Sequence, residues 1–214
     1  MSEQETPVKV SPPGGARPPG GGLADFVGAR ITGIQEQYVR TQPTSRSRAV
    51  LAQLRRGLGK PVGELPELLE HVVDPQAHPS RGNGATPDEQ AAYTAITLYA
   101  LHQQSQRKRM HVHDRRFGQA VGRLRFQDGA ENQGVLRRFQ ALATASSVEE
   151  LVHHARGLIT LLRGAGLGFD YGRFAEDLAR YQNPTQVDAV RLAWGRDFYR
   201  TTTSTNDSTA EEQS

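Results

Sequence analysis

The sequence predicts an all-α protein, and three observations support this fold class. Apolar residues recur at spacings of three and four in nearly every segment between residues 23 and 200. No segment of any length alternates apolar and polar residues with the period of two that marks a strand. Several segments open with residues that cap helices well. We therefore expect a bundle of about eight or nine helices. A boundary near Gly129 would divide it into two helical halves, 23–128 and 129–200.

The first three predicted helices follow from apolar spacing and from turn residues. In Leu23–Arg40, apolar residues stand at positions 23, 26, 27, 31, 34 and 38. In Thr44–Leu58, one side carries Val50, Leu51, Leu54 and Leu58, and a run rich in glycine and proline follows. Leu65–Val73 is a short helix after that run, and a loop rich in proline and glycine extends from Asp74 to Ala85.

The fourth predicted helix has the clearest start. Thr86 can cap it, Pro87 suits the first helical position, and Glu89 completes a capping box. From Ala91 to Leu101 the helix is apolar nearly all round. A helix without a polar stripe belongs in the middle of a bundle.

The remaining helices are amphipathic. In Asp114–Phe126, Asp114 is the expected N-cap and Phe117 faces inward; Asn132–Ala145 uses Val135, Leu136, Phe139 and Leu142. A helix opened by Ser147 stops at Gly164–Gly168, Asp170 caps one that runs through Tyr181, and Asn183-Pro184 opens a last one that ends near Arg200. We interpret Trp194, Phe198 and Tyr199 at its end as core anchors, with base stacking by Tyr199 as the alternative.

The ends and the composition restrict the class of protein. Residues 1–22 form a leader rich in glycine and proline, residues 201–214 a tail rich in Thr, Ser and Glu, and both are expected to be disordered. No cysteine is present, so disulfides and Cys-type zinc sites are excluded. The acidic start predicts no secretory signal, and the apolar run from Ala91 to Leu101 is too short to span a bilayer. We expect a soluble, cytoplasmic protein without a membrane partner.

Charge is sharply segregated along the chain. Residues 30–60 contain seven Lys or Arg and one acid, and residues 101–138 contain nine and three, so each block carries +6. The rest of the chain carries −9, which leaves a net charge of +3. Arginine outnumbers lysine by 23 to three, and a guanidinium grips phosphate with two parallel hydrogen bonds. The pattern predicts a surface that binds nucleic acid.

The candidate contacts lie on predicted helices, on faces that point away from the apolar residues. Arg48 and Arg55 are seven residues apart, as are Arg116 and Arg123, so each pair shares a face. Acidic partners are mostly missing, since residues 37–63 contain no Asp or Glu. Arg107–Arg109 are expected to close the buried helix at its C-terminal end. The predicted nucleic-acid-binding set is Arg46, Arg48, Arg55, Arg56, Arg107, Lys108, Arg109, Arg115, Arg116, Arg123, Arg137 and Arg138. No base-reading motif is present, so the surface is expected to grip backbone phosphates.

Catalytic signals are weak. One segment, His111-Val112-His113-Asp114, contains the His-Asp dipeptide found in helical metal-dependent phosphohydrolases. Such a site needs further ligands from neighbouring helices, and His102, His153 and His154 are the candidates. Asp114 is equally explained as a helix cap. There is no Gly-rich phosphate loop and no Ser-His-Asp arrangement. The sequence predicts a non-catalytic protein without a metal or other cofactor.

Several motifs together resemble one family. Ser47–Arg56, with the sequence SRAVLAQLRR, resembles the N-terminal arginine-helix motif of the CasB family, the small subunit of the type I-E CRISPR Cascade surveillance complex. Three later stretches agree with that family: Arg115–Gly118 (RRFG), Val135–Phe139 (VLRRF) and Arg191–Tyr199 (RLAWGRDFY). Their order and spacing are similar from about residue 25 to 200. The leader departs from the family pattern.

The resemblance implies an all-helical, non-catalytic subunit, present in two copies. It implies contact with crRNA, with target DNA including the displaced non-target strand, and with the large and helical-backbone Cascade subunits. Pairing with the guide would supply sequence specificity. Two alternatives stay open: a pure protein–protein scaffold whose arginines face acidic partners, and a metal phosphohydrolase at His113 and Asp114.

Overall fold

The computed structural model describes residues 22–39, 43–77, 82–127 and 130–207, with the backbone alone for 202–207. This part of the chain contains nine α-helices, one short 3-10 helix and no strand, which confirms the predicted fold class. The elements are α1 (Leu23–Val39), α2 (Ser45–Arg56), η1 (Pro66–Leu68), α3 (Leu69–Val72), α4 (Pro87–His102), α5 (Phe117–Arg125), α6 (Gln133–Ala143), α7 (Val148–Ala165), α8 (Tyr171–Tyr181) and α9 (Val187–Asp207). The leader up to residue 21 and Arg40 lie outside the described residues.

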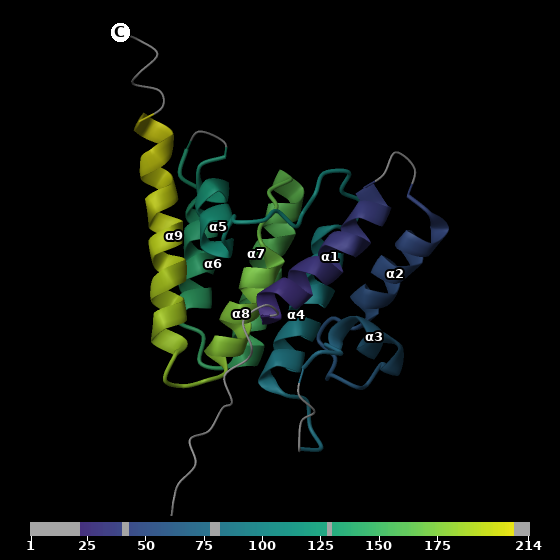
Figure 1. Cartoon of the computed structure of the whole chain (residues 1–214). Helices are drawn as coiled ribbons and strands as arrows, with labels where there is room; N and C mark the ends of the chain where they lie inside the picture. Colours follow the sequence, from purple (N-terminus) through teal and green to yellow (C-terminus); the bar gives the residue numbers. More distant parts are fainter. Residues whose placement is uncertain (1–21, 40–42, 78–81, 128–129, 208–214) are drawn as a thin grey trace, which may run out of the picture.

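The helices form a row with α9 at one end and α2 and α3 at the other (Figure 1). The most extensive contacts join α5 to α9, α1 to α8, α4 to α8, and α6 to α7. Helices from both predicted halves therefore pack directly together. The division into 23–128 and 129–200 stays a prediction, and the boundary itself falls on residues that the structure does not describe.

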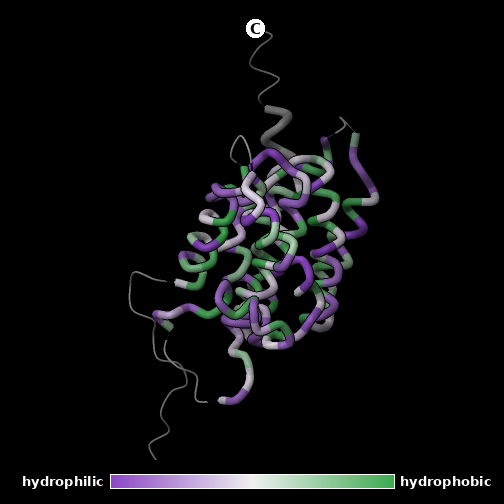
Figure 2. Tube along the Cα trace, turned by 90° about the vertical axis from the view of Figure 1, so that its right-hand side faces the viewer, coloured by the Kyte–Doolittle hydropathy of each residue, from purple (hydrophilic) through white to green (hydrophobic). Residues whose placement is uncertain are grey.

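Helix α4 lies in the middle of the bundle, as its sequence predicts. Its capping box is formed: the Thr86 hydroxyl accepts the Glu89 N–H at 3.1 Å, and the Glu89 carboxylate accepts the Thr86 N–H at 2.7 Å. Every residue from Ala91 to Ala100 is buried. The other helices mix apolar and polar positions every few residues (Figure 2), as expected for helices with one buried face.

Two pairs of helices approach closely because a glycine lies at the contact. A Cβ on Gly118 of α5 would lie 2.5 Å from the Trp194 carbonyl oxygen of α9. A Cβ on Gly172 of α8 would lie 2.3 Å from the Ala24 carbonyl oxygen of α1. These are backbone atoms, so neither contact leaves room for a side chain.

The last helix departs from its prediction in two ways. Trp194 and Phe198 are buried, but Tyr199 is 50% exposed, so its interpretation as a core anchor is wrong. The backbone of α9 continues to Asp207, past the end predicted near Arg200. Threonine has a low helix propensity, but extending an existing helix is far easier than nucleating one.

Asp114 does not cap α5, which begins at Phe117. Its backbone adopts a left-handed conformation with φ of 62°, and its N–H donates to the Asp170 carboxylate at 3.0 Å. The reason is tertiary. The preceding chain runs alongside residues 168–170, where Val112 N–H donates to the Phe169 carbonyl and Phe169 N–H to the Met110 carbonyl, both at 3.0 Å. These backbone bonds replace the first helical turn that local sequence predicts.

Within the described residues, no helix combines the length and the hydropathy required to cross a membrane.

Candidate nucleic-acid interface

The first group of predicted cations lies on α2. The Thr44 hydroxyl caps this helix by accepting the Ser47 N–H at 3.1 Å. Leu51 and Leu54 are buried against the bundle. The exposed cations are Arg46, Arg48 and Arg56, whereas Arg55 is half-buried. The Arg48 guanidinium donates to the Pro43 carbonyl at 3.0 Å, which holds it at the solvent side of the helix.

The second group, Arg107, Lys108 and Arg109, lies in a loop rather than at the end of the buried helix as predicted. Helix α4 ends at His102, and the buried Gln103 side chain organises the turn that follows. Its amide nitrogen donates to the carbonyls of Gln106 (3.0 Å) and Lys108 (2.9 Å), and its amide oxygen accepts the Met110 N–H (3.1 Å). All three cations are exposed. The loop that carries these cations is positioned by the hydrogen bonds of the buried Gln103 amide, and not by an interaction of the cations with the helix dipole.

Replacing Gln103 with leucine should lower the free energy of unfolding by about 2 kcal/mol, because it leaves the buried Met110 N–H and two partly buried carbonyls without a partner. Urea denaturation measures this change. Gln106→Leu is the matched control, since the turn uses the backbone carbonyl of Gln106 and not its side chain. Equal loss in both variants would contradict the role of the Gln103 amide.

The third group lies on and around α5 and α6. Arg123, Arg137 and Arg138 are exposed, and Arg115 and Arg116 are half-buried. The Arg115 guanidinium donates to the Gly168 carbonyl at 3.3 Å. Burial, with a smaller contribution from the nearby Arg123 cation, lowers the pKa of Arg115. Two guanidinium groups thus lie near one another, an arrangement that a shared anionic ligand would stabilise.

The predicted cations have few acidic partners among the described residues, unlike four of the arginines outside the set. Of the twelve, only Arg116 has a carboxylate of a described residue within 4.0 Å, that of Asp197 at 3.7 Å. Arginines outside the set do form such pairs: Arg125 with Glu131, Arg173 with Asp170, Arg180 with Asp177, and Arg191 with Asp188. The charge segregation seen in the sequence is therefore retained in three dimensions.

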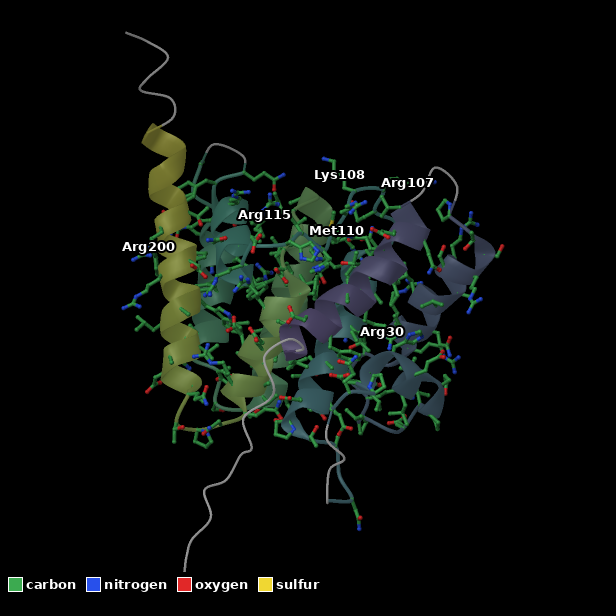
Figure 3. The ribbon with its side chains drawn as sticks, in the orientation of Figure 1. Arg30, Arg107, Lys108, Met110, Arg115 and Arg200 are labelled. Atoms are coloured by element: carbon green, nitrogen blue, oxygen red, sulfur yellow. The ribbon has the colours of Figure 1, made fainter. Side chains whose placement is uncertain are left out.

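The structure does not gather the twelve cations into one cluster. Helix α2 lies at one end of the row, and α5 and α6 lie toward the other (Figure 1). The loop between α4 and α5 bridges part of this distance, because Arg107, Lys108 and Arg115 all lie in the upper half of Figure 3. One continuous track stays a prediction.

The segment that contains the predicted His-Asp dipeptide, His111–Asp114, is bound to neighbouring elements by hydrogen bonds and an ion pair. His111 is 2% exposed; its N–H donates to the Gln35 amide oxygen at 2.8 Å, and its Nδ1 accepts the Tyr171 N–H at 3.1 Å. Burial lowers the pKa of His111 to about 4, although the Asp170 carboxylate partly opposes this shift. Asp114 lies 3.5 Å from the Arg173 guanidinium. In the described ranges, no group of three His, Asp or Glu side chains is arranged to hold a metal ion.

The predicted nucleic-acid-binding set leaves out a group of side chains on α9, of which only Tyr199 has a nucleic-acid role predicted from the sequence, as an alternative. Arg196, Tyr199 and Arg200 are exposed, and Arg200 lies on the side of α9 that faces away from the bundle (Figure 3). They lie outside both basic blocks, in the part of the chain with net negative charge. The available signal was the spacing Arg196-x-x-x-Arg200, which puts two cations on one helical face, with Tyr199 one turn after Arg196.

Together, the fold and the site define a class: an all-helical protein with unpaired surface cations on several separate elements. Residues 50–199 match the family model of the CRISPR-associated protein Cse2. The chain therefore belongs to the Cse2 family, also called CasB, the non-catalytic small subunit of the type I-E CRISPR Cascade. This assignment confirms the resemblance seen in the sequence.

Solved structures agree with the family assignment. CasB from Thermobifida fusca is 35% identical to this chain, with a TM-score of 0.69 over 82% of this chain and 97% of that protein. A Cse2-family protein from Thermus thermophilus is 23% identical, with a TM-score of 0.59 over 83% and 97%. A chain of a CRISPR RNA-guided surveillance complex is 21% identical, with a TM-score of 0.63 over 87% and 99%. The last two likenesses concern the fold. A comparison with curated protein sequences finds no match.

Proposed function

We propose that this chain is the small subunit of a type I-E CRISPR surveillance complex. In that complex it would bind the guide-RNA and target-DNA region, including the displaced non-target strand, through its exposed cations. The observation that carries the proposal is that eleven of the twelve predicted cations lack a carboxylate partner among the described residues. Guanidinium groups without carboxylate partners are available to phosphate oxygens. They lie on α2, on the loop after α4, and on α5 and α6.

The absence of a base-reading motif agrees with this role. Guanidinium contacts to phosphate fix position and carry no sequence information. In a guide-RNA complex, base pairing with the guide supplies the specificity. A small subunit would then contribute affinity, and its contacts would tolerate any target sequence.

Single-stranded DNA binding at increasing salt concentration tests the proposal. If about six of the cations contact phosphates, the logarithm of the association constant should fall with the logarithm of salt concentration with a slope near −4. Replacing Arg55 and Arg137 by glutamate should weaken binding and reduce the slope to about −3, because two contacts are lost.

Arg156→Glu is the control for charge alone, since Arg156 is exposed on α7 but lies outside the predicted set. A slope near zero, or an affinity unchanged in the double variant, would contradict the proposal. Co-purification of the chain with a small crRNA and the larger helical-backbone subunits tests whether it assembles into such a complex.

A second candidate function, protein docking, is favoured by one feature. A groove of about 780 Å³ between α1 and α8 is lined by five carboxylates and by one arginine, Arg173. The carboxylates belong to Asp25, Glu36, Asp114, Asp170 and Glu176. Such a groove would repel nucleic acid and suits a cationic protein surface. A chain that acted only as a scaffold would bind no isolated DNA or RNA even at low salt.

A further inference from the structure

Tyr199 is the one aromatic side chain among the exposed large apolar residues of the described chain. Its neighbours on α9, Trp194 and Phe198, are 1% and 0% exposed, whereas Tyr199 is 50% exposed. The core therefore does not require this ring, and roughly half of its surface faces solvent.

The Tyr199 ring is braced from the inner side. It meets the Phe198 ring edge-on, with centroids 4.9 Å apart and an interplanar angle of 86°. The Arg125 guanidinium lies 5.6 Å from its centroid. Arg125 is itself fixed, because it pairs with Glu131 and lies over the Phe198 ring at 5.2 Å. A ring held in this way loses little conformational freedom when a flat ligand stacks on it.

Exposed cations lie within one helical turn of Tyr199 on α9 and on the neighbouring helix α5. Arg196, one turn earlier on α9, is exposed and has no ion pair with any residue that the structure describes. Arg200 follows Tyr199 directly and is also exposed. Arg123 is exposed on α5, which packs along α9. Arg196 and Arg200 thus precede and follow the ring along the helix axis, where their guanidinium groups could hold the phosphates on either side of a stacked base.

We propose that Tyr199 is a base-stacking platform for single-stranded nucleic acid, with Arg196 and Arg200 binding the adjacent phosphates. The proposal rests on the function proposed above and deepens it by naming the form of nucleic acid bound at α9. Duplex bases are already stacked on each other, so a single exposed ring selects an unpaired strand. A protein partner fits this face less well. Leu192, the other large apolar residue exposed on α9, lies two turns away, about 10 Å along the axis, with Arg196 between.

Fluorescence anisotropy with the full chain tests the platform. The probes are a labelled single-stranded DNA of mixed sequence and the same strand with abasic sites throughout. Tyr199→Ala should weaken binding to the normal strand about ten-fold, and Tyr199→Phe should keep the affinity of the parent. The parent should bind the abasic strand more weakly, and Tyr199→Ala should show no further loss on that strand. Leu192→Ala is the control for truncating an exposed apolar residue of α9.

Each contrary outcome has a distinct meaning. If Tyr199→Ala binds both strands as the parent does, while the Arg55 and Arg137 reversal still weakens binding, the platform is overturned and the proposed function stands. If the parent binds neither strand at low salt, both fail. If Tyr199→Ala and Leu192→Ala leave DNA binding intact but both weaken assembly with partner subunits, α9 is a protein-docking face and the platform is overturned.

Discussion

Replacing Gly172 with alanine should destabilise the protein by about 3 kcal/mol or more. The new Cβ would lie 2.3 Å from the carbonyl oxygen of Ala24 and 3.1 Å from its carbonyl carbon. Both atoms belong to the backbone of α1, so no side-chain rotation can relieve the overlap. The two helices would have to separate, and α1 packs on α8 more extensively than on any other helix. The free energy of unfolding from urea titration measures the loss.

Gly157→Ala is the matched control. Gly157 lies in the exposed part of α7, and a Cβ there would have no atom within 4 Å. Alanine favours a helix interior over glycine by about 1 kcal/mol, so this variant should be at least as stable as the parent. If Gly172→Ala proved as stable as Gly157→Ala, the close approach of α1 and α8 would be wrong.

Most helices could be predicted from the sequence because their determinants are local. The capping box at Thr86 and the apolar residues of α4 act within a few positions of one another, and the structure confirms both. The chain between α4 and α5 could not be predicted, since its conformation depends on distant partners. His111 accepts a hydrogen bond from Tyr171, 60 residues away, and the adjacent backbone bonds displace the helix start from Asp114 to Phe117.

The candidate site was predictable in part for the same reason. Helical spacing predicted that Arg48 and Arg55 share one face of α2, because a face depends only on neighbours one or two turns away. It could not give the distance between that face and the cations of α6, which depends on how the bundle is assembled. Tyr199 was misassigned because it directly follows Phe198, the last residue of the apolar stripe, but the next residue of a helix points about 100° away from that stripe and here remains half-exposed.

Acid should destabilise this fold strongly through a single buried imidazole. His102 is 0% exposed at the end of α4; its Nδ1 is 2.9 Å from the Tyr171 hydroxyl, and its Nε2 has no hydrogen-bond partner among the described residues. Burial lowers the pKa of His102 to about 3, and the nearby carbonyls of Leu162 and Leu167 offset this only in part. A protonated, charged ring at this fully buried position would not be solvated by water, so its charge would be costly.

The direction of the effect follows from comparing the two states. Above pH 6.5, His102 is neutral whether the chain is folded or unfolded, and it contributes nothing to the pH dependence. Between pH 6.5 and about 3 the unfolded chain binds a proton that the folded chain rejects, so stability falls as the pH falls. Over the whole window the loss should reach about 4 to 5 kcal/mol, a large share of the stability of an ordinary domain.

Replacing His102 with glutamine separates this titration from the other acid-sensitive groups. Glutamine can still hydrogen-bond the Tyr171 hydroxyl but cannot take up a proton. The variant should be less stable than the parent at pH 7, because the site is shaped for an imidazole. Between pH 6 and 4, however, its free energy of unfolding should fall less steeply, by about 1.4 kcal/mol per pH unit. Urea denaturation at intervals across this range measures both slopes. The His111 side chain, whose pKa is also lowered by burial, should leave a residual slope in the variant. If the slopes of the parent and the variant were parallel, His102 would be protonated as readily in the folded chain as in the unfolded one.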